Sequence, residues 1–139
     1  DISLELGEYF QRELVGRGAC IGDYDNDGDL DIFIMNLNDY SVFLRNNKGN
    51  QNNWLIIKLE GTSGNRDGIG SRVKLTSGGK TQTALKKSTT GYLSQNDPRI
   101  HFGLAKNSIA DRIEIKWPSG KVQILENIKA NQILEVKEP

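Results

Sequence analysis

The sequence is poor in several residue types on which catalytic and disulfide chemistry depends. Its 139 residues include one cysteine, Cys20, and one histidine, His101. A single cysteine excludes an internal disulfide and leaves the redox compartment open. A lone histidine flanked by apolar residues is typically a hydrogen-bonded structural side chain, so His101 is expected to be structural.

The chain also lacks an excess of charge of either sign, with 18 basic and 18 acidic residues. A basic surplus is the usual sign of a protein that binds nucleic acid or an anionic membrane, so neither partner is expected. The longest apolar run is far shorter than the roughly 20 residues of a membrane-spanning helix, so no membrane insertion is expected either.

No group of residues in the sequence has the pattern of a catalytic site. The serines have no visible base partner, and no glycine-rich phosphate loop opens a helix. We therefore expect a protein that is not an enzyme, and we assign no catalytic and no organic-cofactor residue.

One segment is, by contrast, densely acidic: it reads Asp23-Tyr24-Asp25-Asn26-Asp27-Gly28-Asp29-Leu30-Asp31. Ca²⁺ takes six to eight oxygens at about 2.3–2.6 Å, and a loop with side chains at positions 1, 3 and 5 can surround it. Glycine at position 6 permits the sharp reversal of such a loop. The sequence predicts a calcium site, with Asp29 binding through its backbone carbonyl and side-chain ligands from Asp23, Asp25, Asp27 and Asp31.

This loop admits two other interpretations. A polar turn held by Asp side chains is the simpler alternative, but crowded carboxylates repel one another without a cation. An EF-hand requires a bidentate Glu at position 12 and flanking helices. Position 12 is Ile34, in a β-branched and aromatic run typical of a strand, so we expect a calcium loop between strands.

Short runs with strand character and glycine-rich or polar turns between them favour an all-β fold. Before the polar segment 46–53, strands are expected at 17–22, 30–36 and 40–45. After it, seven short strands in about 85 residues predict a β-sandwich or barrel-like domain. The predicted domains are 1–50, a repeat with the calcium loop, and 51–139, a β domain.

The segment Gly22–Phe33 resembles the calcium loop of an FG-GAP/VCBS repeat, the blade unit of integrin-like β-propellers. Residues 53–136 resemble the ASPIC/UnbV domain that follows such repeats in the cartilage acidic protein-like family. The pieces that carry this second resemblance are Asn65–Gly70, Gly91–Gln95, His101–Leu104 and Trp117–Gly120.

This resemblance implies a propeller-blade-like repeat packed on an ASPIC/UnbV β domain, but not its activity. The family usually has several repeats before this domain, and here there is room for about one. A lone blade cannot close a ring, so we expect either a part of a longer multi-repeat protein or a minimal unit in which the two parts pack together.

Three functions follow as hypotheses. The first is a calcium-stabilised protein-interaction or adhesion module, secreted, extracellular or periplasmic, because loops of this kind usually need high free Ca²⁺. The second is a Ca²⁺-dependent carbohydrate-binding module, in which Tyr24 is the one aromatic residue within the loop. The third is a non-catalytic accessory to a biosynthetic enzyme, which predicts a concave polar pocket between loops 61–70 and 91–99. The protein or glycan partner itself is not specified by the sequence.

Overall fold

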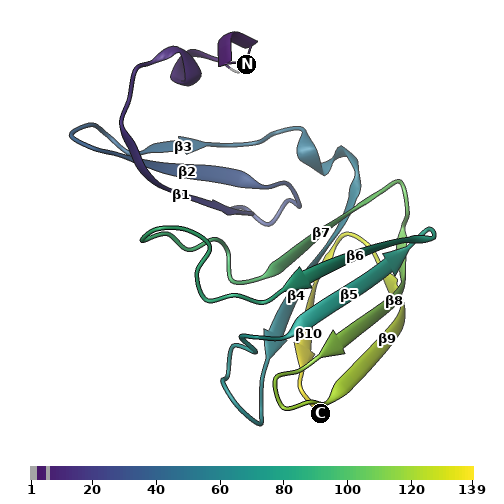
Figure 1. The fold of residues 1–139 in the computed structure, drawn as a ribbon. Coiled ribbons are helices and arrows are strands. Elements are labelled where there is room, and N and C mark those ends of the chain that lie inside the picture. Colours follow the sequence, from purple (N-terminus) through teal and green to yellow (C-terminus); the bar gives the residue numbers. More distant parts are fainter. Residues whose placement is uncertain (1–2, 6) are drawn as a thin grey trace.

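The computed structural model describes residues 3–5 and 7–139, and the chain is built of strands (Figure 1). No α-helix occurs in this described part. Its helical turns are the 3₁₀ segments η1 (Ser3–Glu5), η2 (Glu8–Gln11) and η3 (Gly49–Gln51). None of them is long and apolar enough to cross a membrane. The predicted all-β fold class is confirmed.

The first sheet has three antiparallel strands in the order β1-β2-β3, with the bounds Gly16–Gly22, Asp31–Asn36 and Val42–Leu44. The acidic segment connects β1 to β2, so the predicted loop does lie between strands. Asp31 is the one buried residue in these three strands. The sheet therefore lacks an apolar core of its own and depends on its neighbours for stability.

Seven further strands form two sheets that pack face to face, as the sequence predicted for the second half of the chain. One sheet has the order β10-β4-β7, with β10 parallel to β4, and the other has the order β6-β5-β8-β9. Their bounds are β4 Asn53–Glu60, β5 Arg72–Ser77, β6 Lys80–Leu85, β7 Ile100–Ala105, β8 Ile109–Lys116, β9 Val122–Lys129 and β10 Gln132–Lys137.

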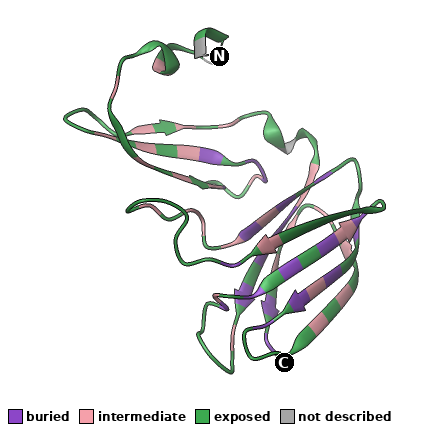
Figure 2. Cartoon of the chain, viewed as in Figure 1, coloured by how far each residue is buried: buried purple, intermediate pink, exposed green. Residues whose placement is uncertain are grey.

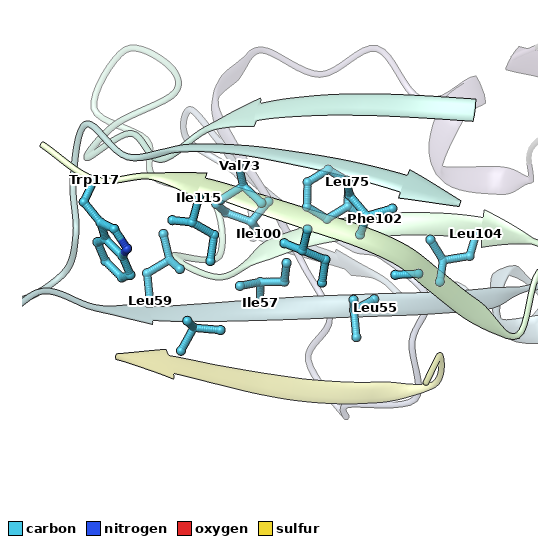
Figure 3. Packing of buried hydrophobic residues seen from close by; sticks show 13 residues of the cluster. Leu55, Ile57, Leu59, Val73, Leu75, Ile100, Phe102, Leu104, Ile115 and Trp117 are labelled. Atoms are coloured by element: carbon cyan, nitrogen blue, oxygen red, sulfur yellow. The ribbon is translucent and has the colours of Figure 1, made fainter. Parts of the chain in front are cut away.

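The core of the molecule lies between these two sheets (Figures 2 and 3). Alternate residues of each strand point inward, because successive side chains of a strand face opposite ways. Burial of this apolar surface, worth roughly 25 cal/mol per Å², is the main stabilising contribution to the sandwich. The buried side chains include Leu55, Ile57, Leu59, Val73, Leu75, Phe102, Ile113, Ile115 and Trp117.

Strand β4 is buried on both faces. Leu55 and Ile57 point into the sandwich, and Ile56 points the other way, yet it is only 1% exposed. On that outer side Ile56 lines a cavity of about 320 Å³ together with Leu30 of the acidic loop and His101 of β7. The acidic loop therefore lies against the outer face of sheet β10-β4-β7.

Candidate metal centre

The carboxylate of Asp23 organises the acidic loop from within. Its Oδ1 accepts a hydrogen bond from the backbone N–H of Asp27 at 3.1 Å, and its Oδ2 accepts one from Gly28 at 2.9 Å. Gly28 has a φ of +98°, a left-handed conformation that glycine adopts readily, so it serves as the predicted reversal. Asp23 is 3% exposed, so these bonds are shielded from water.

Three of the predicted ligands come together in this loop. Asp23, Asp25 and Asp27 each offer one carboxylate oxygen, and these oxygens lie within 4.8 Å of one another. Hard oxygen donors carrying negative charge are what Ca²⁺ prefers, so the residues present fit such an ion.

The other two predicted ligands have their carboxylates engaged by backbone N–H groups, one in the acidic loop itself and two in the segment that follows β3. Asp31 accepts hydrogen bonds from the N–H of Tyr24 at 3.1 Å and of Asn46 at 2.9 Å. Asp29 accepts one from the N–H of Gly49 at 2.8 Å. Neither side chain belongs to the three-residue cluster, and the ligand roles predicted for Asp31 and for the Asp29 carbonyl stay predictions.

Arg45 adds a positive charge to the edge of the cluster. Its guanidinium forms an ion pair with the carboxylate of Asp25, and the two side chains are 54% and 27% exposed. An exposed pair of this kind contributes little to stability. It does neutralise part of the charge that a bound cation would meet.

Two residues of the sandwich contact the acidic loop at its turn. The Nε2 of His101 lies 2.9 Å from the carbonyl oxygen of Gly28, and because a carbonyl only accepts, this nitrogen carries the proton. Gly28 packs directly on the indole of Trp54: a Cβ at Gly28 would lie 1.8 Å from its Nε1. The prediction that His101 is a hydrogen-bonded structural side chain is confirmed, and Trp54 of β4 packs against the turn of the acidic loop.

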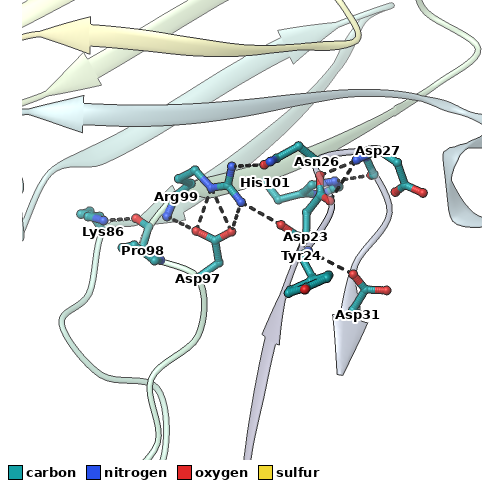
Figure 4. Close-up of polar contacts among 11 residues, drawn as sticks. Asp23, Tyr24, Asn26, Asp27, Asp31, Lys86, Asp97, Pro98, Arg99 and His101 are labelled. Atoms are coloured by element: carbon teal, nitrogen blue, oxygen red, sulfur yellow. Dashed lines mark hydrogen bonds and ion pairs between the residues drawn. The ribbon is translucent and has the colours of Figure 1, made fainter. Parts of the chain in front are cut away.

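Arg99, just before β7, contacts the same loop and also forms an ion pair with Asp97 (Figure 4). Its Nη2 donates to the carbonyl oxygen of Asp23 at 2.9 Å and its Nη1 to Oδ1 of Asn26 at 2.6 Å. Burial by itself raises the pKa of Asp97, but hydrogen bonds from Arg99 outweigh it and leave this pKa below its usual value. The pair is therefore fully charged at neutral pH.

Lys86 contacts the segment that carries Asp97 and Arg99. It is 7% exposed, and its Nζ donates to the carbonyl oxygen of Pro98, the residue between Asp97 and Arg99. Burial lowers the pKa of Lys86, and the nearby carboxylates of Asp67 and Asp97 oppose that shift.

The loops 61–70 and 91–99 do share a concave surface, as the hypothesis of an accessory protein predicts. A cavity of about 410 Å³ lies between them and the acidic loop. Asp67 lines it from the first loop, Pro98 and Arg99 from the second, and Asn26 from the acidic loop. Lys86 also lines it, so the cavity wall is rich in charge.

Sequence reasoning did not identify Arg45, Lys86 or Arg99 as parts of this site. Asp97 also accepts the backbone N–H of Arg99 at 2.8 Å, a local contact of the kind that stabilises turns. No local signal distinguishes a lysine or arginine that a distant segment buries from one that lies on the surface. The missing information is tertiary.

The chain is similar to known proteins over most of its length. Residues 61–139, more than half of the chain, match the family described as ASPIC and UnbV. The chain is 32% identical to cartilage acidic protein 1 of Homo sapiens and 31% identical to that of Mus musculus, over 98% of its own length. It spans only 21% and 22% of these relatives. The chain belongs to the ASPIC and UnbV family.

Proposed function

We propose that this chain is a calcium-stabilised, non-catalytic interaction module that acts outside the cytosol. The observation that carries the proposal is the convergence of the Asp23, Asp25 and Asp27 carboxylates within 4.8 Å. Their position between two strands, and their spacing, support a first sheet of the FG-GAP/VCBS type.

A divalent cation held by these three residues would offset the repulsion among their charges and hold β1 and β2 at a fixed spacing. Asp31 and the carbonyl of Asp29 would complete the ligand set. Sites of this kind in extracellular modules bind Ca²⁺ at about 10⁻⁴–10⁻³ M, which matches the free calcium outside cells. A site with an affinity in this range would suit a secreted, extracellular or periplasmic location.

The surface proposed for interaction is one face of the first sheet. Cys20, Phe33 and Phe43 pair across β1, β2 and β3, so their side chains share a face. Phe33 and Phe43 are 40% and 43% exposed, and with Tyr24 they line an apolar hollow of about 780 Å³. Exposed aromatic side chains that share one face of a sheet are a candidate surface for a protein partner. Further repeats of a longer parent protein are the partner that we favour.

The test is calorimetry of the chain with a chelator and with 1 mM Ca²⁺. A ligand that binds only the folded state with a Kd of about 10⁻⁴ M stabilises it by roughly 1.4 kcal/mol at this concentration, a rise of about 5 °C in Tm. We expect Asp25→Ala to lose this rise. Asp39→Ala, at an exposed position outside the cluster, should keep it. The proposal fails if the unaltered chain shows no calcium-dependent rise.

A Ca²⁺-dependent carbohydrate site is the second candidate. Tyr24 favours it, because this ring is 77% exposed at the edge of the acidic loop and could offer a flat face to a sugar. A glycan array with and without chelator separates the two functions. Glycan binding that vanishes with the chelator and with Tyr24→Ala would favour the carbohydrate site.

A further inference from the structure

The first sheet is held on the sandwich by a small set of polar contacts rather than by an apolar core of its own. Two link β1 to the segment before β7: the N–H of Asp97 donates to the carbonyl oxygen of Ile21 at 2.9 Å, and the N–H of Ile21 donates to Oδ1 of Asn96 at 3.1 Å. The other contacts reach the acidic loop itself. The loop is therefore part of the interface between the two units.

Arg99 is the centre of these contacts. Its Nε donates to both carboxylate oxygens of Asp97, at 3.0 and 2.9 Å, and its two terminal nitrogens reach Asp23 and Asn26. The side chains of Arg99 and Asp97 are 20% and 17% exposed. A planar guanidinium can make this set of bonds simultaneously, and a lysine ammonium cannot.

The turn of the loop is fixed separately. His101 donates to the carbonyl of Gly28, and the indole of Trp54 lies against the Gly28 backbone. Arg99 thus holds the loop at Asp23 and Asn26, and β4 and β7 hold it at Gly28. These three contacted residues belong to the stretch of backbone that positions the Asp23, Asp25 and Asp27 carboxylates.

We propose that Arg99, His101 and Trp54 form a latch that fixes the acidic loop in its metal-binding conformation, so that docking of the first sheet and metal binding are one coupled equilibrium. The coupling to metal rests on the proposed function above, whereas the latch itself does not. Asp23 is the shared element: its backbone carbonyl accepts from Arg99 and its carboxylate belongs to the cluster. Arg99 is a positioning residue and touches no proposed ligand oxygen.

Coupling of this kind is reciprocal. If docking raises the affinity of the loop for Ca²⁺ by some factor, Ca²⁺ must raise the docking constant by the same factor. Outer-shell partners of metal ligands typically account for a 10- to 100-fold effect on metal affinity. The reciprocal effect can be read from amide exchange at Ile21 and Asp97, whose N–H groups bridge the units.

The experiment compares the full chain with Arg99→Lys and with Arg112→Lys, a matched change at an exposed arginine on β8. Calorimetric titration with Ca²⁺ gives the affinity, and amide exchange in chelator gives the docking equilibrium without metal. We expect Arg99→Lys to weaken Ca²⁺ binding at least tenfold, although it keeps the charge. Exchange at Ile21 and Asp97 should accelerate, while exchange at Val73 in the core does not change.

The possible outcomes separate the latch from the metal site. Equal Ca²⁺ affinity for Arg99→Lys and Arg112→Lys overturns the coupling. If the unaltered chain binds no Ca²⁺, the proposed function fails and the coupling fails with it. Amide exchange in chelator then tests the latch alone, and unchanged exchange rates at Ile21 and Asp97 in Arg99→Lys would overturn it. If Arg99→Lys fails to fold, His101→Phe gives a milder test, because it removes a single hydrogen-bond donor to the loop. We expect a smaller loss of Ca²⁺ affinity and of amide protection than for Arg99→Lys. The absence of any such loss would count against the latch.

Discussion

Substituting Gly28 by alanine should undock the acidic loop from the sandwich. Gly28 has a φ of +98°, which costs an L-residue about 1–2 kcal/mol. The added methyl would also lie 1.8 Å from Nε1 of Trp54 and 2.1 Å from its Cε2, far inside contact distance. Loop and indole must separate, which breaks the hydrogen bond from His101 to Gly28 at a further cost of about 1 kcal/mol.

Together these effects predict a loss of about 3 kcal/mol, or about 10 °C in Tm for a chain of this size. The loss cannot exceed the backbone strain plus the free energy of docking, because the chain can escape the clash by releasing the loop. Urea denaturation followed by tryptophan fluorescence measures the change, and Trp54 reports directly on release of the loop.

Gly120 provides a matched control. Its φ is +90°, and a Cβ added there meets no atom within 4 Å, so Gly120→Ala should cost the backbone strain alone. A Trp54→Ala background should relieve the clash and reduce the cost of Gly28→Ala to the same level. The reasoning is refuted if Gly28→Ala and Gly120→Ala destabilise the chain equally in the unaltered background.

Two further predictions concern charge. Arg45→Gln removes the cation paired with Asp25. Both side chains are exposed, and a close charge screened by bulk water is worth about 1 kcal/mol, so Ca²⁺ affinity measured by titration calorimetry should rise about fivefold. An unchanged or weaker affinity would contradict this. At the other end of the chain, the hydroxyl of Ser119 and the N–H groups of Ser63 and Thr62 lower the pKa of Glu138 to about 2. The contribution of the Glu138 carboxylate to stability is therefore complete above about pH 4.5 and is lost as the pH falls towards 2. In urea denaturation, the free energy of unfolding of Glu138→Gln should fall less between pH 4.5 and pH 2 than that of the unaltered chain.

The strands were predictable because their signals are local. The alternation in Arg72–Ser77, followed by the turn at Gly78 and Gly79, defines a hairpin, and the structure pairs Ser77 with Lys80 across it. The acidic loop was predictable for the same reason, since its five carboxylates and its glycine lie within nine residues. The pairing of β10 parallel to β4 carried no such signal, because it joins segments about 77 residues apart.

The latch was not predictable for a related reason. Arg99 and the carbonyl that it binds on Asp23 are separated by 76 positions. Lys86 is 7% exposed, and its Nζ donates to the carbonyl oxygen of Pro98, 12 positions further along the chain. Charged side chains are usually solvated, so the sequence alone favours a surface position for each of them.

The last prediction separates the two roles of the acidic loop, which are to keep its own folded shape and to bind a metal ion. Asp23 accepts hydrogen bonds from two backbone N–H groups inside the loop, whereas Asp25 forms an ion pair with the exposed guanidinium of Arg45. Without metal, Asp23→Ala should therefore lower the free energy of unfolding by about 1–3 kcal/mol, because buried N–H groups lose their acceptor, and Asp25→Ala should change it by less than about 0.5 kcal/mol. With Ca²⁺ both variants should lose the calcium-dependent rise in Tm. If the two are equally stable in chelator, Asp23 has no organising role beyond that of a ligand, and the loop does not hold its shape before the ion arrives.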